Sequence, residues 1–131
     1  MKVEAIARTP PVTATPDTKI RDVARIMAEK KVGLVVIVEE AQPDVAVGVV
    51  GERDIVRAVA SGVNLDEPVS TIMSKPVVTV EWDEPVWKVA EIMKQYNVRR
   101  VVVTKGGKLY GVVGMRDLVT EVLINIIRQL V

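Results

Sequence analysis

Two nine-residue stretches carry the residue types best suited to hold a charged ligand: GVVGERDIV at 48–56 and GVVGMRDLV at 111–119. Each predicts the end of an apolar strand, a glycine corner, and Arg-Asp opening a helix. Such a corner presents unpaired backbone N–H groups and a positive dipole end, which suit an anion. The carboxylate of Asp54 or Asp117 can also accept hydrogen bonds from two neighbouring hydroxyls, such as those of a ribose.

A simpler interpretation stays open for each of these residues. A lone aspartate in the first turn of a helix often only complements the helix dipole. Arg99 and Arg100 could start a solvated strand or pair with Glu91 or Asp117. The Gly-x-x-Gly spacing superficially matches an RNA-binding KH loop, but here the central valines continue a strand and are expected in the core. Because the whole corner occurs twice, we favour a ligand site, with Asp117 as the better candidate.

The composition excludes several function classes. With 18 basic and 17 acidic residues the net charge is +1, which gives no electrostatic case for binding nucleic acid or an anionic membrane. The chain has no cysteine and no histidine, so thiolate chemistry, zinc-thiolate sites and the commonest general base are absent. No signal pattern is visible, and the longest apolar runs are strand-sized, far below the roughly 20 residues of a membrane span. We therefore expect a cytoplasmic protein.

The elements of the first half follow from its apolar spacing. A short strand is expected at Val12–Thr15, and then a helix capped by Asp17 or Thr18 with an apolar stripe from Ile20 to Met27. A buried strand follows at Leu34–Val38. A polar loop at Glu39–Asp44 is expected before the next strand and the 52–61 helix.

The second half repeats this pattern. The spacing is 66 residues from Pro10/Pro76 through Val38/Thr104, and it is 63 afterwards. Residues 105–108, Lys-Gly-Gly-Lys, predict a tight hairpin turn. Trp82 and Trp87 lack counterparts; they are expected to cover the core or to serve a subunit contact. We expect a lead-in at 1–9, a first motif at 10–62, a linker with a helical turn at 63–72, and a second motif at 73–131.

This duplicated β-α-β-β-α unit, ending in Gly-Val-Val-x-x-Arg-Asp, resembles the CBS domain, named after cystathionine β-synthase. The resemblance covers nearly the whole chain as a tandem pair. It implies an α/β (α+β) fold in which two motifs, related by a pseudo-twofold axis, pack sheet to sheet. It also implies two clefts that bind adenosine-containing ligands such as AMP, ADP, ATP or S-adenosylmethionine, and modules that pair into homodimers.

The resemblance also assigns roles to particular residues. Asp54 and Asp117 would accept the ribose diol, and a set of basic residues would face phosphate. That set consists of Arg53, Arg116, Arg99 and Arg100, with Gly33 and Leu34 in the places of the last two in the first half. Four apolar residues would enclose the adenine: Val12, Val32, Val78 and Val98. Each cleft would draw on both repeats. The corner residues Gly51, Gly114, Met115 and Val112 complete the expected site.

One departure from the family pattern concerns Gly51 and Gly114, where the family usually has Ser or Thr. The lost hydroxyl is worth about 1 kcal/mol, roughly fivefold in affinity. Glycine is expected to leave the backbone N–H open to phosphate instead.

Three function classes therefore remain at this stage. The first is a regulatory adenine-nucleotide sensor with no required cofactor, which signals to a separate effector protein. The second is an interaction module with vacant clefts that forms a firm dimer. An enzyme is held in reserve, because no nucleophile–base pair or metal cluster is visible. The long, apolar final helix needs a cover, either the lead-in or another subunit.

Overall fold

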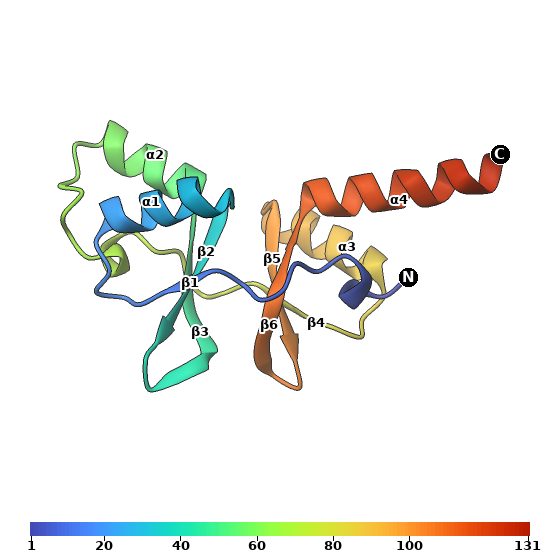
Figure 1. The fold of residues 1–131 in the computed structure, drawn as a ribbon, viewed down its shortest axis with the longest axis horizontal. Coiled ribbons are helices and arrows are strands. Elements are labelled where there is room, and N and C mark those ends of the chain that lie inside the picture. Colours follow the sequence, from blue (N-terminus) through green and yellow to red (C-terminus); the bar gives the residue numbers. More distant parts are fainter. The chain divides into compact units, whose positions relative to one another are not determined.

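The computed structural model describes residues 1–131 and divides into two compact units. We call Pro11–Val77 the first unit, and Met1–Pro10 together with Val78–Val131 the second unit. Each unit contains one three-stranded sheet and two α-helices (Figure 1). The mixed α/β class and the repeated β-α-β-β-α order predicted from the sequence are confirmed.

The first unit is built around the hairpin of its second and third strands. Strand β1 (Thr13–Ala14) pairs in parallel with β2 (Leu34–Glu39), and β2 pairs antiparallel with β3 (Gln42–Gly51). The helices are α1 (Ile20–Lys30) and α2 (Glu52–Ala60), and a 3-10 turn covers Val69–Thr71. Helix α2 begins directly where β3 ends, so the expected corner is formed.

The second unit repeats this topology. Strand β4 (Thr79–Glu81) runs parallel to β5 (Arg100–Lys105), which pairs antiparallel with β6 (Lys108–Gly114). The helices are α3 (Val86–Tyr96) and α4 (Met115–Leu130), and a 3-10 turn covers Val3–Ala5. The predicted turn between Lys105 and Lys108 is confirmed.

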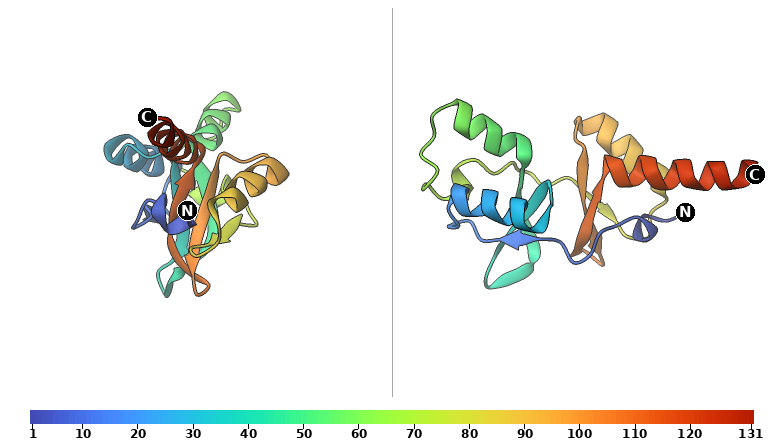
Figure 2. Two further views of the ribbon diagram at one scale, coloured as in Figure 1. Left: turned by 90° about the vertical axis from the view of Figure 1, so that its right-hand side faces the viewer. Right: turned by 45° about the horizontal axis from the view of Figure 1, so that its top comes forward.

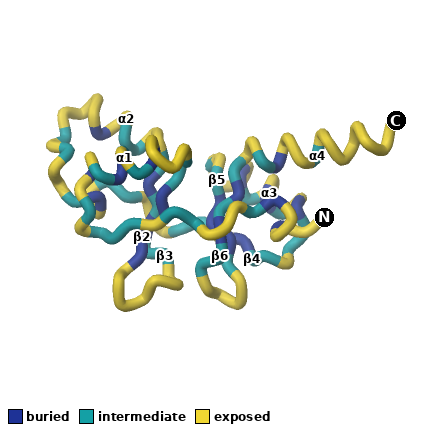
Figure 3. The backbone as a smooth tube through the Cα atoms, viewed as in Figure 1, coloured by how far each residue is buried: buried dark blue, intermediate teal, exposed yellow.

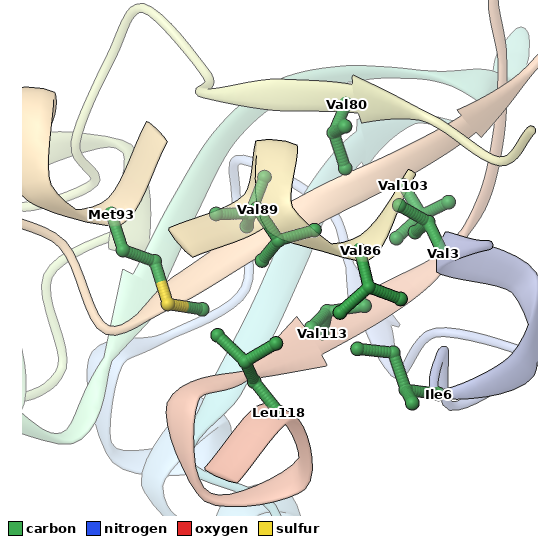
Figure 4. Close-up of a cluster of buried hydrophobic side chains, with 10 residues drawn as sticks. Val3, Ile6, Val80, Val86, Val89, Met93, Val103, Val113 and Leu118 are labelled. Carbon is green, nitrogen blue, oxygen red and sulfur yellow. The ribbon is translucent and has the colours of Figure 1, made fainter. Parts of the chain in front are cut away.

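β-Branched residues dominate the two cores, as the composition indicated. In the second unit Val86, Val89 and Met93 of α3 pack with the sheet, and Leu118 of α4 joins them (Figure 4). Trp82 lies against this core, whereas Trp87 is exposed. Figure 3 shows how burial is distributed along the chain: most buried residues lie on the strands and the α-helices, and three more, Val3, Ile6 and Val69, lie in or directly after the two 3-10 turns.

Two local predictions are wrong. The Glu39–Asp44 segment is not a loop: β2 continues to Glu39, which pairs with Gln42, and β3 runs from there. Backbone pairing extends through these polar residues because Glu40 and Ala41 alone form the turn, which brings Glu39 and Gln42 opposite each other. The N-cap of α1 is Lys19, without a side-chain bond, and neither Asp17 nor Thr18 caps the helix.

The linker supplies the missing cap of α1. The N–H of Ile20 donates to the carbonyl of Glu67 at 3.0 Å, and that of Arg21 donates to the carbonyl of Leu65 at 2.9 Å. These carbonyls satisfy two of the N–H groups that a helix leaves without internal partners. Main chain from a distant part of the sequence therefore replaces the side-chain cap that local sequence suggested.

The N-terminal segment, residues 1–10, packs into the second unit. The N–H of Val86 donates to the Met1 carbonyl at 3.0 Å, and Val3 is fully buried in the core. Arg8 and Val112 exchange two backbone hydrogen bonds of 2.9 and 3.0 Å at the edge of β6. Ser74 forms the same bridge with Val49 in the first unit. Residues 1–10 therefore occupy the same structural position in the second unit as residues 67–76 occupy in the first.

Helix α4 extends well past the sheet of its own unit, as Figure 2 also shows. Leu118 is buried and Val122 packs against the core, but the turns that follow are exposed. The N-terminal segment, one of the two covers expected for this helix, lies instead on the core of the unit. No helix in the chain combines the length and apolar character needed to cross a membrane.

Candidate functional site

Each unit presents one corner where the last strand turns into the following helix. The Asp117 corner consists of Gly114–Asp117 with Arg8, Arg99 and Arg100; the Asp54 corner consists of Gly51–Asp54 with Gly33, Leu34 and Ser74. In the first, Arg100 pairs with Gly114 in the sheet, and the Met115 N–H donates to the Arg99 carbonyl at 2.8 Å. In the second, the Glu52 N–H donates to the Gly33 carbonyl at 3.2 Å. Most of the residues predicted for the phosphate and ribose are therefore together at these corners.

The buried neighbours of the two aspartates fix where the carboxylates lie. Val113, the residue before the last of β6, is buried in the core, and Leu118, one residue after Asp117, inserts into the same core (Figure 4). In the first unit Val50 is buried and Ile55 packs on the core after Asp54. Each first helical turn is thus anchored by apolar contacts on both sides of its carboxylate.

The glycine N–H groups at the two corners are not free, which corrects the sequence expectation. The N–H of Gly114 donates to Asp117 Oδ2 at 3.2 Å, and that of Gly51 donates to Asp54 Oδ2 at 2.8 Å. The aspartate thus folds back onto the start of its helix, in the manner of the N3 residue of a capping box. An anion at either corner must therefore be held by side chains or by N–H groups further into the first turn.

The remaining oxygen of Asp117 is bound by Arg8. The Nε and Nη2 atoms of Arg8 donate to Asp117 Oδ1 at 3.0 and 2.7 Å. These hydrogen bonds and the negative charge of Asp117 raise the pKa of the Arg8 guanidinium. Sequence reasoning missed this ion pair because it left the N-terminal segment unassigned. The sequence did contain a sign that this segment belongs to the repeat. The 66-residue spacing continues back to Val3/Val69 and Ile6/Ile72, which makes Arg8 the counterpart of Ser74 in the repeat.

Asp54 has a weaker partner at the same place. Ser74 Oγ donates to Asp54 Oδ1 at 3.5 Å, the outer limit of a hydrogen bond. Asp54 Oδ1 is therefore largely available to a ligand hydroxyl, whereas Asp117 Oδ1 is occupied. The sequence favoured Asp117 as the ribose acceptor, but its arginine neighbours did not reveal that one of its oxygens is already held.

The other predicted residues divide between the two units. Arg53, Arg99 and Arg116 are exposed, and Arg100 is half-buried. Val12 and Val32 lie against the core of the first unit, and Val78 and Val98 lie against that of the second. Val112 in β6 carries the backbone bonds to Arg8. The structure thus places the four valines beside the sheets, and their role as an adenine wall stays a prediction.

A family model described as CBS domain matches residues 3–61 and 69–124. The chain belongs to the CBS-domain family. A CBS domain protein from Pyrobaculum aerophilum, solved in complex with AMP, is 40% identical and superimposes with a TM-score of 0.84 over 89% of each chain. The CBS domain pair of protein MJ0100, solved with 5′-methylthioadenosine and S-adenosyl-L-methionine, is 30% identical with a TM-score of 0.82, over 92% of this chain and 98% of that one.

An uncharacterised protein of Methanopyrus kandleri is 38% identical over 121 residues. The match covers 90% of this chain but only 61% of that relative. The CBS pair is thus a part of a longer chain in that relative.

Proposed function

We propose that this CBS pair is a regulatory module that binds an adenosine-containing nucleotide and signals its presence to a separate protein. The observation that carries this proposal is the repeated corner, in which a carboxylate lies in the first turn of α2 and of α4, bound by Arg8 at the Asp117 corner and next in sequence to Arg53 at the Asp54 corner. The AMP complex of the Pyrobaculum relative supports adenosine nucleotides as the ligand class. Asp54 and Asp117 accept the ribose hydroxyls, and the nearby arginines face the phosphate.

The mechanism requires the ligand to bind one conformation of the module better than another. Binding at a corner replaces the contacts that hold each carboxylate in the free protein, such as the Arg8–Asp117 pair. Because Arg8 belongs to the N-terminal segment, ligand binding at the Asp117 corner acts directly on that segment. The effector would sense this change through the N-terminal segment or through the exposed end of α4.

Thermal unfolding with AMP, ADP, ATP, S-adenosylmethionine and GMP tests the ligand class. A ligand at 100 times its Kd adds about 2.7 kcal/mol, a shift of several degrees. We expect a shift with adenine ligands that Asp54→Asn and Asp117→Asn each reduce. Asparagine is chosen because its side-chain oxygen can still accept the hydrogen bond of the glycine N–H. Asp66→Asn, which alters only an exposed pair with Arg21, is the matched control. An equal shift with GMP, or an unchanged shift in both corner variants, would refute the assignment.

A second candidate function, interaction through a homodimer, rests on α4. Five exposed apolar residues recur at helical spacing on one side of this helix and form what we call the α4 stripe: Val119, Leu123, Ile126, Ile127 and Leu130. A second copy is the partner that such a stripe fits, since a twofold axis would bring two identical stripes together. The module could dimerise in this way with or without a nucleotide.

Sedimentation of two α4 variants tests the dimer. Leu123→Glu places a charge in the stripe and should shift the protein to monomer. Asn125→Glu, on the other side of the same helix, should leave the sedimentation coefficient unchanged. A wild-type protein that is monomeric at high micromolar concentration would contradict the dimer but not the nucleotide site.

A further inference from the structure

The two corners occupy equivalent places in the repeats, but their charges differ. At the positions that form them, the Asp117 corner has four arginines and one aspartate, whereas the Asp54 corner has one arginine and two acidic residues. The formal charge is thus +3 at one corner and −1 at the other. The pairs, with the Asp117 corner first, are Arg8/Ser74, Arg99/Gly33, Arg100/Leu34, Met115/Glu52, Arg116/Arg53 and Asp117/Asp54.

The hydrogen bonds of the two carboxylates also differ: those of Asp117, at the more positive corner, are the stronger ones. Asp117 Oδ1 receives two charge-assisted bonds from one guanidinium, at 2.7 and 3.0 Å. Asp54 Oδ1 faces only a neutral hydroxyl at 3.5 Å. A ribose hydroxyl reaching Asp54 displaces a weak contact, but one reaching Asp117 must compete with an ion pair.

Arg8 is placed to exchange its partner. Its backbone is fixed by two hydrogen bonds to Val112, but 67% of its side chain is exposed, so the guanidinium can turn without unfolding the segment. A phosphate offers this guanidinium a multiply charged acceptor that fits its planar fork. When Arg8 moves to a phosphate, Asp117 Oδ1 becomes free for the ribose of the same ligand. A ligand without phosphate has to break the ion pair and offers the Arg8 guanidinium no new acceptor.

We propose that the two corners are specialised for different adenosine ligands, an inference that rests on the proposed function. The Asp117 corner selects ligands with a 5′-phosphate, and Arg8 is the residue that sets this selectivity. The Asp54 corner accepts adenosine ligands whose 5′ group is uncharged or cationic. One module can thereby respond to two chemical classes of adenosine ligand.

Titration calorimetry with AMP and adenosine tests the Asp117 corner in an Asp54→Asn background, which removes the other carboxylate. We expect AMP to bind at least about tenfold more tightly than adenosine, given several favourable charge pairs, and its affinity to fall as salt is added. Arg8→Ser, which copies the residue of the other corner, should weaken AMP and strengthen adenosine. Arg8→Lys, which keeps the charge but loses the fork, should retain part of the AMP preference.

The reciprocal variant provides the matched control. In an Asp117→Asn background the Asp54 corner should bind adenosine at least as tightly as AMP, and Ser74→Arg should shift its preference toward AMP. An AMP-to-adenosine affinity ratio that Arg8→Ser leaves unchanged, in a variant with wild-type melting temperature, overturns the specialisation while the proposed function stands. Wild-type protein that binds no adenosine ligand at all overturns both.

Discussion

Replacing Gly111 by alanine should detach the N-terminal segment from the second unit. A Cβ atom built on Gly111 would lie 2.5 Å from the Arg8 carbonyl oxygen and 2.8 Å from Thr9 Cγ2. The first of these neighbours is main chain, so the contact can be relieved only by moving the segment. That movement breaks the two backbone hydrogen bonds between Arg8 and Val112.

The expected magnitude combines two effects. Overpacking typically costs about 1–3 kcal/mol. Two lost hydrogen bonds add about 1 kcal/mol each. We therefore expect Gly111→Ala to lower the free energy of unfolding by about 4 kcal/mol, which in a chain of this size lowers the melting temperature by about 15 °C.

Gly48, the counterpart of Gly111 in the first unit, is the matched control. A Cβ atom there would lie 2.6 Å from the Sδ atom of Met73, close to the end of a flexible side chain. Because methionine can change rotamer, Gly48→Ala should lower the free energy of unfolding by only about 1 kcal/mol. Circular dichroism melts of both variants measure the difference. Equal losses would refute the argument that main chain, rather than side chain, makes the Gly111 contact tight.

Three further predictions follow from other contacts. Val3→Ala and Val69→Ala, at two fully buried valines, should each lower the free energy of unfolding by about 2 kcal/mol in denaturant titrations, and a near-zero loss for Val3 would show that the N-terminal segment is not part of the core. Glu81 accepts a 2.6 Å hydrogen bond from Thr104 Oγ1, which lowers the pKa of its carboxyl below the ordinary 4.5. Its stabilising effect is therefore complete above that pH and lost as the pH falls through the lower folded-state value, so melts of Glu81→Gln and wild type should differ at neutral pH and converge in acid. A Cβ atom at Gly51 would make only ordinary contacts of 3.7 Å or more, so Gly51→Ser should fold normally and bind adenosine ligands about fivefold more tightly; weaker binding would contradict a ribose-facing corner.

The fold could be predicted from the sequence because its signals are local and occur twice. The apolar stripes beginning at Ile20 and Val86, the hairpin turn at Gly106, and the two glycine corners each follow from a few adjacent residues. Because the pattern repeats at a spacing of 66 and then 63 residues, the interpretation of each element is supported by a second copy of that element. The structure agrees with the predicted element order for this reason.

The site was predicted less completely because its decisive contacts are distant in sequence. Arg8 and Asp117 are 109 residues apart, and Arg8 lies in a segment with neither helical nor strand periodicity. The cap of α1 likewise comes from Glu67, which no pattern near Ile20 reveals. Side-chain types indicated which groups gather at the corners, but not which of them already bind each other.

The course of the chain through the two units has a consequence for the order in which they form during synthesis. The first unit is continuous from Pro11 to Val77, so all its strands and its edge segment have been made once residue 77 is complete. The second unit needs both Met1–Pro10 and Val78–Val131. Its N-terminal segment is made first but finds its partner Val112 only about a hundred residues later. Val3 and Ile6, both apolar, therefore have no core to join until the strand that contains Val112 has been made, and we expect the second unit to form after the first.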